Sequence, residues 1–317
     1  MPHVLIAGKI HAAGLDLLRA AMDVSFDFVS EVSVESFLPY LAAADAILIR
    51  TQPLRETEIA KAPKLKIVSR HGVGYDAVDV AALNARRIPL AIVGDVNSRA
   101  VAEHTLMLML SAARRTVAHD QASRGGEWNV RNRFETTELD GKTLLVIGFG
   151  RIGRRVADLA RAFGMTVLAH DPFAKDLAGA EAVASIDTAL PRADYVSLHL
   201  PSMPGGAVIG AREITLMKPS ATIINAARGG LVDEAALDAA LRESRLAAAA
   251  LDTLADEPPK PGNPLLQNPK VTISPHSAGL TDECTARMAI SAAQNILDCF
   301  AGKLDRKLVV NAEAIGL

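Results

Sequence analysis

The sequence LLVIGFGRIG, residues 144–153, decides the fold because a short apolar run passes directly into a Gly-x-Gly-x-x-Gly motif. Residues 154–163 then have helical spacing, and residues 167–170 form a second apolar run. This strand–turn–helix–strand order predicts a dinucleotide site. The three glycines permit the tight turn, the close approach of a pyrophosphate and the packing of helix on strand, and the helix N-terminus offers free N–H groups to phosphate. The predicted phosphate contacts are Gly148, Gly150, Arg151, Ile152 and Gly153.

Asp171 selects between the two nicotinamide cofactors. It ends the second apolar run, 23 residues after Gly148. A carboxylate at this place hydrogen-bonds the ribose hydroxyls of NAD and repels the 2′-phosphate of NADP. Pro172 and Phe173 follow, so no adjacent Arg would accommodate that phosphate. The sequence therefore predicts NAD, with NADP disfavoured; the plainer alternatives are a tight turn with no ligand and an Asp171 that merely caps a helix.

Apolar runs alternate with helix-like segments along almost the whole chain. Before residue 95 they are residues 3–7, 24–28, 46–49, 66–69 and 89–93. After residue 143 they are residues 144–147, 167–170, 195–198, 222–225, 248–251 and 271–273. Continuous apolar strands with intervening helices indicate parallel sheets covered on both faces, so an α/β fold is expected. Between the two groups, residues 99 to about 121 are predicted to form one long helix, and residues 285–301 a last one.

Length and composition exclude several classes of protein. The chain has 317 residues and a formal net charge of −2, without the basic excess that nucleic acid or an anionic membrane attracts. No apolar stretch approaches the roughly 18 residues of a membrane-spanning helix, and Lys9 ends the N-terminal run too early for a signal peptide. Two cysteines, Cys284 and Cys299, form no CxxC pair. We expect a soluble, cytoplasmic protein with no metal site, no membrane and no nucleic-acid partner.

Three ionisable residues follow late strands. Arg228 comes after residues 222–225, Glu257 after 248–251 and His276 after 271–273. The carboxyl ends of parallel strands share one edge of the sheet, so all three are expected beside the cofactor. Arg can bind a carboxylate with its planar fork, His can donate a proton as hydride arrives, and Glu can fix the His tautomer. Taken singly, each would be an ordinary strand-end residue; together they predict reduction of a 2-keto acid.

These motifs make the chain resemble the D-2-hydroxyacid dehydrogenase family over essentially its whole length. Beside the glycine motif with Asp171, the matching segments are residues 72–76, 97, 101–104, 139–143, 199–201, 225–229, 250–252 and 274–276. The resemblance implies two doubly wound domains, a Rossmann cofactor domain (residues 99–286) inserted in a flavodoxin-like substrate domain (residues 1–98 and 287–317). It also implies a substrate cleft that closes to exclude water, and a homodimer formed through the cofactor domain with its arm, residues 99–145.

By the same resemblance Arg228, Glu257 and His276 are the catalytic residues, and Asp252 orients the nicotinamide carboxamide. Pro201 and Ala227 join the cofactor contacts, as does His276. Val73 and Gly74 would offer backbone N–H groups to the substrate carboxylate, where neighbouring glycines permit close approach. His104 lies on an apolar helix and is expected to pack or to act in a hinge, and Trp128 to anchor the arm by packing.

The substrate is less well defined. Arg50, Arg70 and His71 end or follow strands of the first domain and are predicted to bind an anionic substrate, although strand-end charges are often only solvated. Arg131 and Arg133 lie in the arm, and the sequence leaves open whether any of the four arginines reaches the substrate. Family members that act on 3-phosphoglycerate resemble this arrangement. We therefore expect 3-phosphoglycerate first, then hydroxypyruvate or glycerate and glyoxylate, with sulfolactate behind; no regulatory domain is expected after the last helix.

Three alternatives compete with this interpretation. Formate dehydrogenases pair the His with Gln, so Glu257 argues against them. Phosphite dehydrogenase keeps the Glu and is not excluded by these three residues. An NAD-sensing corepressor on the same fold would bind partners without turnover, and an intact set of catalytic residues favours catalysis over it.

Overall fold

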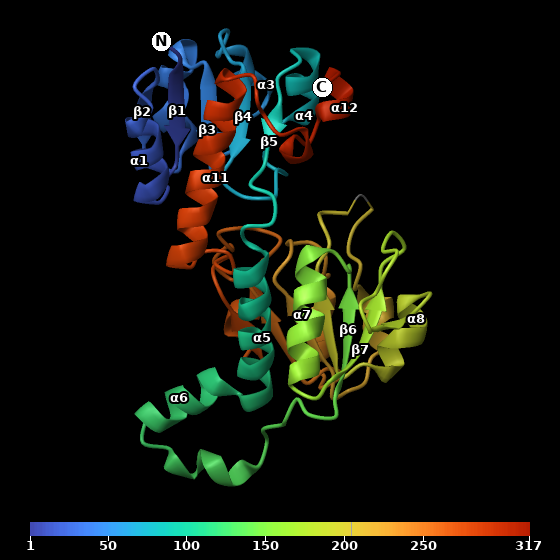
Figure 1. Ribbon diagram of the computed structural model, residues 1–317. Coiled ribbons are helices and arrows are strands. Elements are labelled where there is room, and N and C mark those ends of the chain that lie inside the picture. Colours follow the sequence, from blue (N-terminus) through green and yellow to red (C-terminus); the bar gives the residue numbers. More distant parts are fainter. Residues whose placement is uncertain (204) are drawn as a thin grey trace. The chain divides into compact units, whose positions relative to one another are not determined.

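The computed structural model describes residues 1–203 and 205–317, which form two compact units (Figure 1). The first unit comprises residues 1–97 and 280–317, and the second comprises residues 98–279. The first chain crossing thus follows residue 97, and the second follows residue 279, where residues 98 and 287 were expected.

The first unit is a parallel sheet with strand order β2-β1-β3-β4-β5. This is the flavodoxin-like order, as expected. Its strands are β1 (His3–Ala7), β2 (Ser25–Val29), β3 (Ala46–Ile49), β4 (Ile67–Arg70) and β5 (Leu90–Ala91). Helices α2 (Val34–Phe37), α3 (Glu56–Ala60) and α4 (Val80–Ala85) pack their apolar residues onto one face. The long helix α11 (Asp282–Phe300) contacts β3 and β4, which explains why β3 is buried along its whole length.

Helix α1 (Ala12–Ala20) packs directly against α11 because Gly14 has no side chain. A Cβ at residue 14 would lie 2.8 Å from the Ala289 carbonyl oxygen. Thr281 caps α11, since its Oγ1 accepts a hydrogen bond from the Cys284 N–H. The last helix therefore begins at Asp282, three residues before the predicted start. After it come η5 (Arg306–Leu308) and α12 (Ala312–Ile315).

The second unit is a parallel sheet with strand order β12-β11-β10-β9-β6-β7-β8. The strands are β6 (Thr143–Ile147), β7 (Thr166–His170), β8 (Glu181–Ala182), β9 (Tyr195–Leu198), β10 (Thr222–Asn225), β11 (Ala248–Leu251) and β12 (Val271–Ile273). This is a Rossmann order extended by β12, with its switch point between β6 and β9. Strand β8 was not predicted, because Glu181 and Ala182 are exposed and carry no apolar run.

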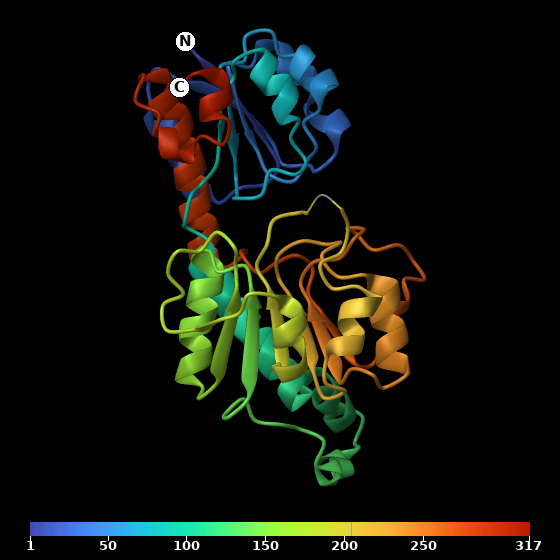
Figure 2. The same ribbon diagram turned by 90° about the vertical axis from the view of Figure 1, so that its right-hand side faces the viewer.

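Helices cover both faces of this second sheet (Figure 2). One apolar core lies under α5 (Ser98–Arg114) and α7 (Arg151–Ala162). The other lies under α8 (Ile186–Ala189), α9 (Ala211–Leu216) and α10 (Glu234–Arg242). Helix α7 begins at Arg151, earlier than the predicted residue 154, because the glycine turn leads straight into it.

The predicted single helix over residues 99–121 is wrong, because the chain breaks at Arg115. Helix α5 ends at Arg114, Arg115 is left-handed (φ 49°), and α6 (Thr116–Arg124) starts again in a new direction. The Arg115 guanidinium lies 2.5 Å from Glu135, a residue of the segment that returns after η2 (Trp128–Arg133). The break therefore depends on a partner twenty residues further along the chain.

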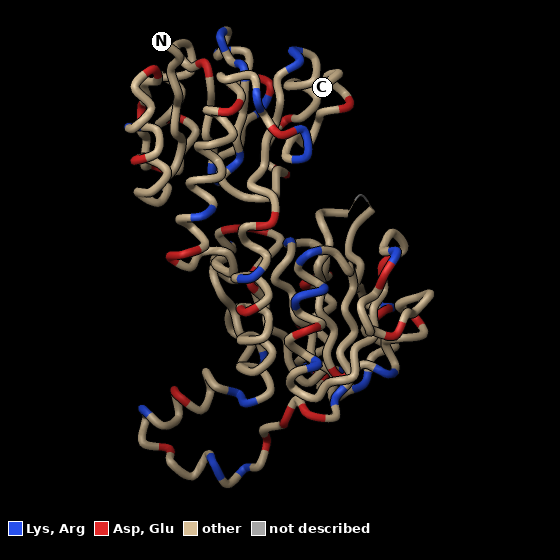
Figure 3. The backbone as a smooth tube through the Cα atoms, viewed as in Figure 1, with Lys and Arg blue, Asp and Glu red and all other residues tan. Residues whose placement is uncertain are grey.

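Charge is mixed along both units: Lys and Arg alternate with Asp and Glu (Figure 3). In the part of the chain that the structure describes, no helix is both long and apolar enough to cross a membrane.

Candidate active site

The carboxyl edge of the second sheet collects the predicted cofactor and catalytic residues. Gly148 follows β6, Arg228 follows β10, and His276 follows β12. Asp252 follows β11 directly, and Glu257 lies in the loop after it. The four strands that carry them run parallel in one sheet, with β9 between β6 and β10, so their ends lie on one edge.

The glycine turn fits a pyrophosphate. Gly148 has φ +91°, and a Cβ there would lie 2.6 Å from the His199 carbonyl oxygen, while a Cβ at residue 153 would lie 2.2 Å from that of Gly148. Gly150 differs, since its Cβ would meet nothing within 4 Å. Protein packing therefore explains Gly148 and Gly153 but leaves the space beside Gly150 for a ligand. Gly150 also makes no side-chain cap for the twelve-residue helix α7, whose first N–H groups can receive phosphate.

Asp171 follows β7 and shapes the same turn. Its Oδ2 accepts a hydrogen bond from the Phe149 N–H at 2.7 Å, and its Oδ1 accepts from the N–H groups of Phe173 and Ala174 at 2.8 and 3.2 Å. No helix starts here, so the alternative of a helix cap is wrong. The carboxylate therefore fixes the glycine turn against the loop that follows β7.

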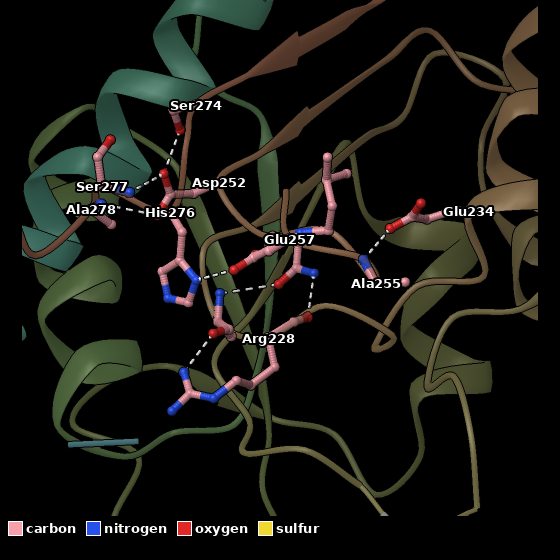
Figure 4. Close-up of polar contacts among 12 residues, drawn as sticks. Arg228, Glu234, Asp252, Ala255, Glu257, Ser274, His276, Ser277 and Ala278 are labelled. Atoms are coloured by element: carbon pink, nitrogen blue, oxygen red, sulfur yellow. Dashed lines mark hydrogen bonds and ion pairs between the residues drawn. The ribbon is translucent and has the colours of Figure 1, made fainter. Parts of the chain in front are cut away.

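His276 and Glu257 form a close pair (Figure 4). The His276 Nδ1 lies 2.6 Å from Glu257 Oε2, and Glu257 Oε1 accepts the Leu254 N–H at 3.0 Å. Burial raises the pKa of Glu257, but the hydrogen bonds from His276 and Leu254 outweigh it and hold that pKa below its ordinary value. The ionised Glu257 thus accepts a hydrogen bond from Nδ1–H of the half-exposed imidazole, which leaves Nε2 as the ring nitrogen that Glu257 does not hold.

Arg228 lies in a tight loop after β10. The Asn225 side-chain amide donates to the Arg228 carbonyl at 2.8 Å, and Asn225 Oδ1 accepts a hydrogen bond from the Ala227 N–H at 3.1 Å. The Arg228 guanidinium donates to the Ala227 carbonyl at 2.7 Å. A Cβ at residue 229 would lie 1.9 Å from the Leu254 carbonyl oxygen, so the Arg228 loop and the Glu257 loop touch through a glycine.

Asp252 is only 2% exposed, yet it remains ionised. Burial raises its pKa, but side-chain hydrogen bonds from His104 and Ser274 and backbone N–H groups of Ser277 and Ala278 bring that pKa far below the ordinary value. Ser274 Oγ donates to Oδ1 at 2.6 Å, and the two N–H groups donate at 2.9 Å (Figure 4). The result is a fixed buried charge beside the Glu257–His276 pair.

Sequence reasoning missed His104 and Ser274 as partners of Asp252. His104 Nε2 lies 2.9 Å from Ser274 Oγ and 3.3 Å from Asp252 Oδ1. The expectation that His104 only packs or hinges is thus incomplete, since its ring contacts the buried carboxylate. His104 and Ser274 are 170 positions apart in the sequence, so no local pattern links them.

The first unit gathers the predicted substrate residues at its own carboxyl edge, after β3 and β4. The Arg50 guanidinium donates to the Lys9 carbonyl at 3.3 Å, and that of Arg70 donates to the His71 carbonyl at 2.9 Å. The N–H groups of Val73 and Gly74 donate to no partner within the two described ranges, so they can receive an anion. Arg131 and Arg133 lie in η2 of the second unit.

His71 is a buried neutral imidazole. It is 5% exposed, and burial, followed by the charges of Arg50 and Arg70, lowers its pKa from 6.5 to about 4. Its Nε2 has no hydrogen-bond partner among the described residues. A buried ring nitrogen without a partner, next to two arginines, is suited to hydrogen-bond a ligand.

Residues 106–278 match the model of the D-isomer specific 2-hydroxyacid dehydrogenase, NAD binding domain. The chain belongs to the D-isomer specific 2-hydroxyacid dehydrogenase family. The resemblance seen in the sequence is thereby confirmed, as is NAD as the cofactor of the matched domain.

Relatives extend this match to nearly the whole chain. A D-3-phosphoglycerate dehydrogenase of Methanocaldococcus jannaschii is 39% identical over 316 residues, which are 98% of this chain and 59% of that protein. The crystal structure of a glyoxylate reductase from Paecilomyes thermophila shares 31% identity with a TM-score of 0.86, over 98% of this chain and 99% of that one. A D-lactate dehydrogenase from Aquifex aeolicus, complexed with NAD and lactic acid, shares 27% identity with a TM-score of 0.88, over 97% and 98%.

The chain spans only 50–59% of the length of the curated relatives that it matches. The two-domain α/β fold is shared over the full length of the solved structures.

The neutral His71 predicts a loss of stability in acid. Its folded pKa of about 4 lies below the unfolded value of 6.5, so the unfolded chain binds the extra proton, and stability is lost as the pH falls from 6.5 towards 4. By linkage this one group accounts for about 2 kcal/mol between pH 7.5 and pH 5. Urea unfolding at both pH values measures the free energy of unfolding that is lost between them. In His71→Asn this loss should be smaller than in the wild type by about that amount. Equal losses in variant and wild type would contradict the prediction.

Proposed function

We propose that the protein is an NAD-dependent dehydrogenase that interconverts a small anionic D-2-hydroxy acid and its 2-keto acid. The observation that carries this proposal is the 2.6 Å contact between His276 Nδ1 and Glu257, on the sheet edge that also carries the glycine turn. An imidazole fixed in one tautomer beside a cofactor turn is what a proton donor to a keto oxygen requires.

Each residue has one role in this proposal. When bound, NADH supplies the hydride. His276 donates a proton to the keto oxygen from the ring nitrogen that Glu257 does not hold, while the ionised Glu257 stabilises the charged ring. Arg228 binds the substrate carboxylate and polarises the carbonyl with its planar fork. Asp252 accepts a hydrogen bond from the carboxamide of the nicotinamide.

The cofactor contacts follow from the same geometry. The N–H groups at the start of α7 receive the pyrophosphate, and Asp171 receives the ribose hydroxyls. The proposed full set is Gly148, Gly150, Arg151, Ile152, Gly153, Asp171, Pro201, Ala227, Asp252 and His276. In domain terms we propose the second unit, residues 98–279, as the NAD-binding domain and the first unit, residues 1–97 with 280–317, as the substrate domain.

The first substrate that we propose carries a second negative charge, on a phosphate. Arg50 and Arg70 bring two positive charges to one edge, and the unpaired N–H groups of Val73 and Gly74 can receive a carboxylate. His71 stays neutral and can donate or accept. Phosphate matches the planar forks of arginine, so 3-phosphoglycerate is the first candidate, and hydroxypyruvate and glyoxylate follow. The names of the relatives, a phosphoglycerate dehydrogenase and a glyoxylate reductase, support this order.

An NADH-oxidation screen tests the proposal. The panel is 3-phosphohydroxypyruvate, hydroxypyruvate, glyoxylate, pyruvate, phenylpyruvate and sulfopyruvate, with NADPH in parallel. We expect one preferred anionic keto acid with NADH. No turnover with any of them, with NADH still bound, would favour the corepressor-like alternative and would contradict the proposal.

His276→Ala should lower turnover by at least roughly 10²-fold, because a lost proton donor costs about this much. The protein should still bind NADH, since the glycine turn and Asp171, which hold the pyrophosphate and the ribose in this proposal, are untouched. Steady-state kinetics on the preferred keto acid, with NADH fluorescence titration as the control, measure both. Unchanged turnover would remove His276 from the mechanism.

We further propose a homodimer through the arm. Trp128 is 64% exposed and Phe134 is 88% exposed, which is unusual for large apolar side chains on one short segment. Light scattering should give twice the 33.5 kDa mass of one chain. The double variant Trp128→Asp/Phe134→Asp should give the monomer, whereas Met22→Asp, at a 96% exposed residue of the first unit, should not. A wild-type monomer would contradict this assignment.

A further inference from the structure

The loop that carries Glu257 needs an anchor. After β11 ends at Leu251, the chain forms no further helix or strand until η4 (Pro264–Gln267). Among the described residues, the Glu257 carboxylate hydrogen-bonds to the Leu254 N–H of its own loop and to His276. The position of its carboxylate, and with it the imidazole, therefore depends on what holds residues 254–263.

Glu234, the first residue of α10, is bonded to this loop at two places. Its Oε1 accepts the Ala255 N–H at 2.5 Å, and its Oε2 accepts the Asn263 side-chain amide at 3.1 Å. The two anchors lie on either side of Glu257 in the sequence. Figure 4 shows Glu234 reaching Ala255 from the helix, away from His276.

Glu234 is not needed to cap its own helix. Asp233 is the N-cap of α10, and its Oδ1 accepts the N–H groups of Ala235 and Ala236, both at 3.0 Å. A glutamate in the first turn favours the helix dipole only weakly. Both oxygens of Glu234 are instead committed to residues 255 and 263.

The same helix start follows the Arg228 loop. Gly229 lies against the Leu254 carbonyl, where a Cβ would come within 1.9 Å. The Glu257 loop is therefore contacted at two neighbouring places, by the Arg228 loop through Gly229 and by the start of α10 through Glu234. Glu234 supplies the polar part of this contact and Gly229 the steric part.

We propose that Glu234 is a positioning residue, which holds the 254–263 loop at both ends and thereby fixes the Glu257 carboxylate against His276. The proposal rests on the proposed function, because it concerns the proton donor of that reaction. A misplacement of about 1 Å at a catalytic group can cost on the order of 10²-fold in rate. Glu234 reaches neither the glycine turn nor Asp171, so cofactor binding should not depend on it.

The kinetic test compares neighbouring variants. Glu234→Ala should lower kcat by about 10- to 100-fold, with the Kd for NADH unchanged. Glu234→Gln should keep part of kcat, because its carbonyl oxygen can still accept the Ala255 N–H. Asp233→Ala is the matched control, since it removes the helix cap but leaves the loop contacts, and its kcat should stay within about 2-fold. Equal kcat values in Glu234→Ala and Asp233→Ala would overturn the proposal.

A second readout does not need a substrate. Hydrogen exchange of the Ala255 amide should become faster in Glu234→Ala and stay unchanged in Asp233→Ala. The carboxyl titration of Glu257, followed by ¹³C NMR, should move up towards the ordinary pKa in Glu234→Ala, because the bonds from His276 and Leu254 loosen, while the charge of Asp252 stays. Unchanged exchange and titration would overturn the proposal. If the wild-type protein turned over none of the keto acids while Glu234→Ala still showed these changes in exchange and titration, the proposed function alone would be overturned.

Discussion

The buried charge of Asp252 is the constraint on which the catalytic edge depends. An ionised carboxylate that is 2% exposed is costly unless donors surround it. Donors converge on it from α5 and from the segment after β12, through His104, Ser274, Ser277 and Ala278. The His276 N–H also donates to the Asp252 carbonyl at 2.8 Å, and His276 itself takes a left-handed backbone (φ 50°). The hydrogen bonds that surround Asp252 thus also fix the turn over residues 274–278, which carries the His276 imidazole.

Two carboxylates near one imidazole perform different tasks because their surroundings differ. Asp252 is buried and accepts hydrogen bonds from several donors, so it acts as a permanent charge. Glu257 is half-buried and keeps one oxygen for His276 alone. The pKa of each lies below its ordinary value, but through different partners. Such a separation of environments is how neighbouring acids take separate roles.

The sequence predicted what depends on local pattern. Apolar runs placed the main strands within a residue or two, and the glycine motif placed the turn into α7, because steric limits at Gly148 and Gly153 act over a few residues. Tertiary partners decided the rest. The break at Arg115 depends on Glu135, and β8 pairs through its backbone without an apolar pattern. The contact of His104 with Asp252 and that of Glu234 with Ala255 join distant segments, so no spacing rule could find them.

The contact at Gly229 has a consequence for how such a chain could change its chemistry. Any side chain at residue 229 would collide with the Leu254 backbone, so the two loops of the second unit can vary only together. A substitution at residue 229 is therefore tolerated only where the backbone at Leu254 moves as well, which restricts the sequence changes that this pair of loops can accept.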